Sequence, residues 1–154
     1  MGDTLVVGLG SAFRGDDAAG LAVVDRLRKS EGRGLRVLAE TRGWAGVLDH
    51  WTGQDDAIVV DSAQSGCSPG RVWRFDGLTE SIPERLFRTS THAVGFGEAV
   101  GLAGSLGRLP RKLVVFGIEG EAFEPGSGLS PRVEASVEKV VDLILRECRA
   151  HNAG

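Results

Sequence analysis

The chain has 154 residues, of which 42% are hydrophobic and 25% are charged, and its formal net charge is −3. This length suits one domain with one substantial core, and the slightly acidic balance argues against a nucleic-acid-binding protein. No apolar run approaches the roughly 20 residues that a membrane-spanning helix needs, and no signal peptide is evident, so we expect no membrane attachment. Cys67 and Cys148 lack the spacing of a zinc or redox motif, which favours free thiols and a cytoplasmic protein.

Strand-like and helix-like segments alternate along the chain. The strand candidates are continuous apolar runs rich in β-branched residues, which is typical of strands buried on both faces of a parallel sheet. We therefore expect an α/β fold of three layers, α/β/α, with a twisted, mostly parallel sheet of about five strands flanked by helices. We expect one domain over residues 1–154, with residues 149–154 as a frayed tail. The predicted strands are Thr4–Val7, Leu35–Ala39, Ala57–Val60, Arg71–Phe75 and Leu113–Ile118, and the predicted helices are Asp17–Lys29, Gly46–Trp51, His92–Leu106 and Pro131–Arg146.

The most informative stretch runs from Val7 to Gly20, where a strand leads into a glycine-rich turn and then a helix. This order suggests a dinucleotide-binding fingerprint, but the third glycine of G-x-G-x-x-G is replaced by Phe13, which would obstruct close helix–strand packing. The turn also lacks the Lys-Ser or Lys-Thr of a phosphate-binding loop. Two carboxylates, Asp16 and Asp17, would repel a pyrophosphate and favour a cation instead.

Ligands of open α/β sheets bind beyond the carboxyl ends of the strands, and acidic residues are placed there. Asp16 and Asp17 follow the first strand, Asp61 follows the third, and Glu119 follows the last. For the first two, the alternative is a helix cap, and for Asp61 it is a turn hydrogen-bonded to Ser62. We expect these acids to gather along one edge of the sheet.

His92 is the best histidine candidate for a metal ligand. Ser90 or Thr91 can cap a helix that His92 begins, and a helix N-terminus disfavours the imidazolium form. The alternative is a solvent-facing histidine. Together, Asp17, Asp61 and His92 would give a metal ion two oxygen ligands and one nitrogen ligand. Such a set leaves coordination positions open and suits zinc, nickel or manganese. A serine triad is not indicated, because no G-x-S-x-G motif is present, and no H-E-x-x-H motif is found either.

The ordered motifs resemble those of the hydrogenase maturation proteases, which finish the large subunits of [NiFe] hydrogenases. The resemblance extends from about Thr4 to Cys148. It is carried by Gly8-x-Gly10, Arg14-Gly15-Asp16-Asp17, Val59-Val60-Asp61-Ser62-Ala63, Ser90-Thr91-His92, Glu124-Pro125 and Gly128-Leu129-Ser130-Pro131.

This resemblance implies an endopeptidase that removes a C-terminal peptide from the large-subunit precursor after nickel insertion. It implies that Asp17, Asp61 and His92 contact nickel that the precursor supplies, so the resting enzyme carries no metal of its own. Asp16 is then either a helix cap or a group that positions the attacking water. The family segment tied to substrate choice corresponds to Glu40–Gly43. We expect a monomer whose partner is the precursor.

Two other functions are open at this point. The same three residues, Asp17, Asp61 and His92, could bind nickel in a non-catalytic or chaperone-like factor of hydrogenase assembly. A nucleotide-binding domain is a third hypothesis, which Phe13 and the acidic turn disfavour.

Overall fold

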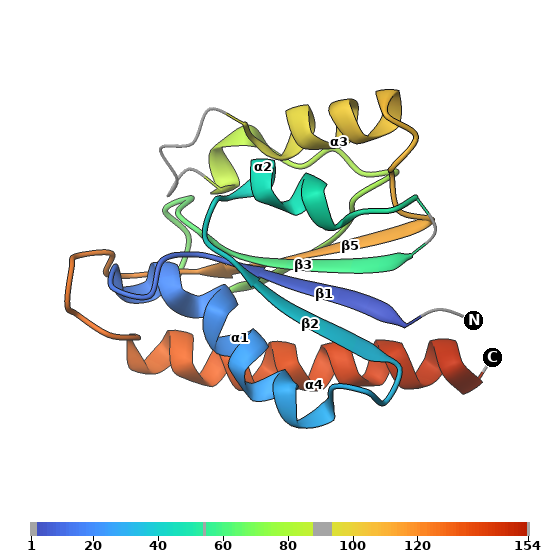
Figure 1. Cartoon of the computed structure of the whole chain (residues 1–154). Helices are drawn as coiled ribbons and strands as arrows, with labels where there is room; N and C mark the ends of the chain where they lie inside the picture. Colours follow the sequence, from blue (N-terminus) through green and yellow to red (C-terminus); the bar gives the residue numbers. More distant parts are fainter. Residues whose placement is uncertain (1–2, 54, 88–93, 154) are drawn as a thin grey trace.

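The computed structural model describes residues 3–53, 55–87 and 94–153, which form a five-stranded sheet with helices on both faces (Figure 1). The strand order is β2-β1-β3-β5-β4. The longer elements are β1 Thr4–Leu9, α1 Ala19–Leu27, β2 Leu35–Glu40, α2 Trp44–Val47, β3 Asp56–Ala63, β4 Val72–Asp76, α3 Phe96–Ser105, β5 Lys112–Glu119 and α4 Pro131–Ala153. Short 3₁₀ turns lie at Gly15–Ala18, Arg28–Ser30, Leu48–His50 and Glu84–Phe87.

The sheet is parallel except at one edge. Strand β1 pairs in parallel with β2 and β3, and β3 pairs in parallel with β5, whereas β4 runs antiparallel to β5. This arrangement confirms the predicted three-layer fold with a mostly parallel sheet. Each predicted strand is present and longer or shifted by a few residues, as expected where boundaries depend on hydrogen bonds rather than composition.

The continuous apolar runs supply two cores, one on each face of the sheet. In β1, Val6 faces α1 and α4, whereas Leu5 and Val7 face α2 and α3. The face of α1 and α4 is filled by aliphatic side chains such as Val137, and the opposite face includes Trp51. Alternate residues of a strand point to opposite faces, so a strand covered on both sides needs apolar residues at every position.

Helix α1 lies unusually close to the sheet because two glycines face each other. A side chain at Gly20 would lie within 3.0 Å of the carbonyl oxygens of Leu9 and Val60, and one at Gly8 would clash with Gly20. Phe13 does not enter this contact, since its side chain is 80% exposed. The expectation that Phe13 would obstruct helix–strand packing is therefore wrong, because Gly20 provides the close approach.

Helix ends differ from the sequence prediction. Residues Gly15–Ala18 form a 3₁₀ turn and α1 begins only at Ala19, with no side-chain hydrogen bond capping either element. The interpretation of Asp16 or Asp17 as a helix cap is therefore wrong. Helix α4 continues to Ala153, through residues expected to fray. Within the described ranges, no helix combines the length and apolar character needed to cross a membrane.

Candidate active site at the carboxyl edge of the sheet

The carboxyl ends of the parallel strands bring acidic residues together along one edge. Asp17 lies in the turn that follows β1, and Asp61 lies in the last part of β3. Glu119 is the last residue of β5 and pairs with Ala63 of β3. Glu40 is the last residue of β2 and pairs with Leu9 of β1. The predicted gathering of acids at this edge is confirmed, and Glu40 adds one that was not predicted.

Asp17 and Asp61 are joined through Ser62. The Ser62 hydroxyl donates to Oδ1 of Asp17 at 2.9 Å, and the Ser62 N–H donates to Oδ1 of Asp61 at 2.8 Å. Ser62 is fully buried and Asp61 is 5% exposed, whereas Asp17 is half-buried. Ser62 thus fixes both carboxylates. The sequence suggested only its hydrogen bond to the neighbouring Asp61, because Asp17 is 45 residues away in the chain.

The two carboxylates are electrostatically incompatible without a positive partner. Burial, and to a lesser extent the charge of the adjacent Asp17, raise the pKa of Asp61 from 3.8 to about 8, although the hydrogen bond from the Ser62 N–H opposes both effects. Asp61 is therefore protonated at neutral pH in the absence of a cation. A divalent cation between the two groups would remove this penalty and displace the proton.

The stability of the protein is expected to fall as the pH rises from about 4 to about 8. Asp61 keeps its proton in the folded chain up to about pH 8 but loses it near 3.8 in the unfolded chain, so unfolding releases a proton in this range. One such group contributes a slope of at most about 1.4 kcal/mol per pH unit. Urea unfolding at pH 5.5 and 8 measures this slope.

The matched variant for this measurement is Asp61→Asn, which retains the shape and the acceptor for Ser62. It should unfold with a much flatter pH dependence over the same range. An unchanged slope in Asp61→Asn would show that another group causes it.

Asp16 is fully buried and binds the loop between β5 and α4. Its carboxylate accepts hydrogen bonds from the N–H groups of Glu121 and Ala122 at 2.7 and 2.9 Å, and from the N–H and hydroxyl of Ser130 at 2.7 Å each. Burial alone would raise the pKa of Asp16, but these donors hold it below its usual value. The loop between β5 and α4 is therefore tied to the turn Gly15–Ala18.

The described residues do not complete a metal site on their own. Within them, no group of three or more histidine, cysteine or acidic residues is placed to hold a metal ion. The predicted third ligand, His92, lies outside the described residues. What the structure supplies is a pair of oxygen donors, Asp17 and Asp61, which suits a divalent cation whose other ligands come from elsewhere.

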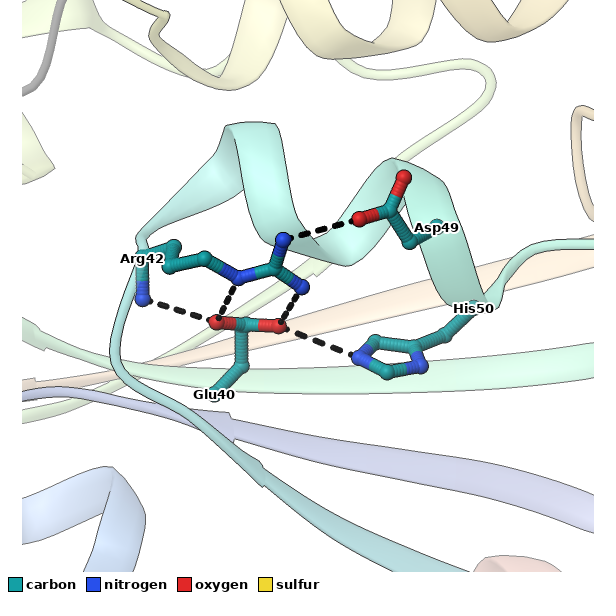
Figure 2. A network of polar contacts seen from close by, with 4 residues as sticks. All are labelled: Glu40, Arg42, Asp49 and His50. Atoms are coloured by element: carbon teal, nitrogen blue, oxygen red, sulfur yellow. Dashed lines mark hydrogen bonds and ion pairs between the residues drawn. The ribbon is translucent and has the colours of Figure 1, made fainter.

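Glu40 forms the centre of a second polar network (Figure 2). Its carboxylate accepts from Nε and Nη2 of Arg42 at 3.1 and 2.9 Å and from the Arg42 N–H at 2.7 Å, and it lies 3.1 Å from Nε2 of His50. Arg42 also donates to Asp49 at 2.9 Å. Burial would raise the pKa of Glu40, but Arg42 and His50 keep it below its ordinary value.

This network fixes the segment that follows β2. It joins the end of β2 to the 3₁₀ turn Leu48–His50, which follows α2, as Figure 2 shows. A side chain at Gly46 would clash with the Glu40 carboxylate, so the small residue is required there. Sequence reasoning missed the network, although Glu40 at the end of a predicted strand beside Arg42 was a usable signal.

Glu119 is also part of the framework. It is 1% exposed and accepts from the N–H and hydroxyl of Ser65 at 2.9 and 2.5 Å. These bonds connect the end of β5 to the segment after β3 and support the position of Asp61. Cys67 and Cys148 are both free thiols, as predicted.

Comparison with known proteins places the chain clearly. A sequence profile for hydrogenase maturation proteases (HycI) matches residues 43–147. The hydrogenase 2 maturation protease of Escherichia coli K12 is 29% identical over 150 residues, which cover 94% of this chain and 90% of the relative. The structure of the hydrogenase-maturating endopeptidase HybD of E. coli superposes with a TM-score of 0.80 at 25% identity, covering 97% of this chain and 93% of the other. A hydrogenase 2 maturation peptidase from a Thaumarchaeota archaeon has a TM-score of 0.65 at 30% identity, covering 94% and 97%.

The three-layer fold is thus that of known endopeptidases, with an acidic edge where such a fold places its active site. The chain belongs to the hydrogenase maturation protease family, which confirms the resemblance seen in its motifs. Its role is that of a protease in hydrogenase maturation.

Proposed function

We propose that this protein removes the C-terminal peptide of a [NiFe]-hydrogenase large-subunit precursor after nickel has been inserted. Asp17, Asp61 and His92 would contact the nickel that the precursor holds. The observation that supports this most directly is the pair of carboxylates that Ser62 holds together, with Asp61 buried and Asp17 half-buried.

Nickel would act as part of the substrate and mark the precursor as ready. Two carboxylates offer too few ligands to retain a free ion tightly, but they can complete the coordination of an ion that the precursor already binds. A precursor without nickel would leave Asp61 protonated and Asp17 without a cation to contact. The enzyme would therefore discriminate between the two precursors by the charge at this edge.

The chemical step would be hydrolysis of one peptide bond by water. Asp17 is half-buried and therefore reaches solvent, and a hydrogen bond from the Ser62 hydroxyl fixes the orientation of its carboxylate. It can accept a proton from the water as the water oxygen attacks the carbonyl carbon, and it can then give that proton to the amine of the leaving peptide as the C–N bond breaks. Asp16, whose oxygens accept four hydrogen bonds, would have a structural role in holding the loop.

We place the reaction in the cytoplasm. Two free thiols suit the reducing cytoplasm, where nickel insertion into the precursor would precede cleavage. The enzyme would act as a monomer that holds no metal between turnovers. Glu40 and Arg42, in the segment that the family resemblance ties to substrate choice, would contribute to recognition of the precursor.

Incubation with nickel-loaded precursor tests the proposal, with trimming followed by gel shift and intact mass. We expect loss of the C-terminal peptide, and much slower loss with His92→Ala. An unchanged precursor, with a known maturation protease active in parallel, would refute the function. Calorimetry with nickel alone distinguishes the proposed protease from the alternative, a non-catalytic nickel-binding factor. A nickel carrier would bind the ion tightly and stoichiometrically, whereas the proposed protease would bind it weakly.

A further inference from the structure

Phe13 is the most exposed large apolar side chain in the described part of the chain. It is 80% exposed, compared with 62% for Leu106, 47% for Leu102 and 37% for Leu78. Single exposed apolar residues are common, but a fully presented aromatic ring beside a functional edge is a typical interface residue. Its position, in the turn that carries Asp17, connects it to the site.

The backbone of Phe13 is held from two sides. Its carbonyl accepts from the N–H of Gly126 at 2.8 Å, and within the turn the N–H of Asp17 donates to the carbonyl of Arg14 at 3.1 Å. The N–H of Asp16 also donates to the carbonyl of Ala122 at 2.7 Å. A ring on a backbone that is already ordered loses little conformational freedom when a partner covers it, which favours binding.

A groove starts at the segment between β1 and α1 that carries Phe13. It has a volume of about 400 Å³ and runs between α1 and β2. Ala12 and Ala18, the neighbours of Phe13 and Asp17 in sequence, line one part of it together with Leu21, whereas Asp25 and Arg28 line the part along the later turns of α1. The groove therefore starts at the segment between β1 and α1, which also carries the exposed Phe13 and Asp17.

We infer that Phe13 and this groove form the docking surface for the precursor polypeptide, with an apolar side chain near the cleaved bond packing on the Phe13 ring. This inference rests on the proposed function, since Phe13, the start of the groove and Asp17 all lie in the segment between β1 and α1, which a polypeptide that reaches Asp17 has to pass. The surface suits a short, transient contact. A buried Phe removes about 150–250 Å² from water, far below the roughly 800 Å² per partner of a stable dimer. A second copy seated there would also cover Asp17.

The test compares Phe13→Ser with a matched control, Leu106→Ser, which removes another exposed apolar side chain just after α3. For Phe13→Ser we expect KM for the nickel-loaded precursor to rise about tenfold or more, with kcat within about twofold of the wild type. Phe13→Leu should recover most of the loss. Leu106→Ser should leave both constants unchanged, and neither serine variant should lower the unfolding midpoint.

Equal KM values for Phe13→Ser and wild type would overturn the inference. So would sedimentation showing that the wild type self-associates and that Phe13→Ser does not, since the surface would then serve a second copy. Direct titration of the precursor onto each variant separates this inference from the proposed function. Wild-type protein that binds the precursor through Phe13 without trimming it would contradict the function and keep the docking surface.

Discussion

Asp61→Asn is expected to reduce the rate of precursor trimming by at least about a hundredfold while making the protein more stable above neutral pH. The loss follows from removing one of two charges that would meet the nickel, and interactions of this kind are worth about 10²–10³ in rate. The stability increases because asparagine carries no charge, whereas the buried Asp61, with a pKa of about 8, destabilises the folded protein as the pH rises. A residue that lowers stability yet is required for activity is typical of a functional site.

The matched control is Asp56→Asn, in the same strand but at its amino end. Asp56 accepts from Nε of Arg111 at 3.0 Å, far from the carboxyl edge, so this change should cost some stability and leave the trimming rate unchanged. Rates are measured from the intact mass of the precursor over time. Trimming by Asp61→Asn at the wild-type rate would remove Asp61 from the site.

Gly20→Ala is expected to destabilise the protein by about 4 kcal/mol or more, or to prevent folding. The added methyl group would lie within 3.0 Å of the backbone oxygens of Leu9 and Val60, and backbone cannot move aside as a flexible side chain can. Helix α1 would have to shift away from the sheet, and the turn that carries Asp17 would shift with it. Urea unfolding measures the loss.

Gly101→Ala in α3 is the control, since this residue is exposed and an added side chain there meets nothing within 4 Å. Alanine in an exposed helix interior should stabilise the protein by about 0.5–1 kcal/mol. A Gly20→Ala protein within about 1 kcal/mol of the wild type would contradict the close approach of α1 to the sheet.

Much of the fold could be predicted because burial on both faces leaves a simple pattern. Runs such as Ile58-Val59-Val60 and Leu113-Val114-Val115-Phe116 have few alternatives to a central parallel strand. Once the strands are parallel, residues at their carboxyl ends must share one edge, so Asp17 and Asp61 could be paired without contact information. The same reasoning does not extend to partners that depend on loop paths.

Contacts between residues that are far apart in the sequence could not be predicted. Asp16 is held by Ser130, which is 114 residues away, and no local pattern predicts such a bond. Gly20 packs against β1 and β3 through backbone geometry, which a motif written for glycine spacing alone does not capture. Phe13 was interpreted as an obstacle for the same reason, because its outward direction depends on the loop that holds its carbonyl.

The central claim is that Asp17 and Asp61 recognise nickel carried by the precursor. The most direct measurement exposes the wild-type protein to nickel-loaded and nickel-free precursor in parallel and follows the C-terminal mass of each. The account predicts trimming of the loaded precursor and at least about a hundredfold slower trimming of the nickel-free one. Equal trimming of both would contradict it, since cleavage would then not depend on the metal.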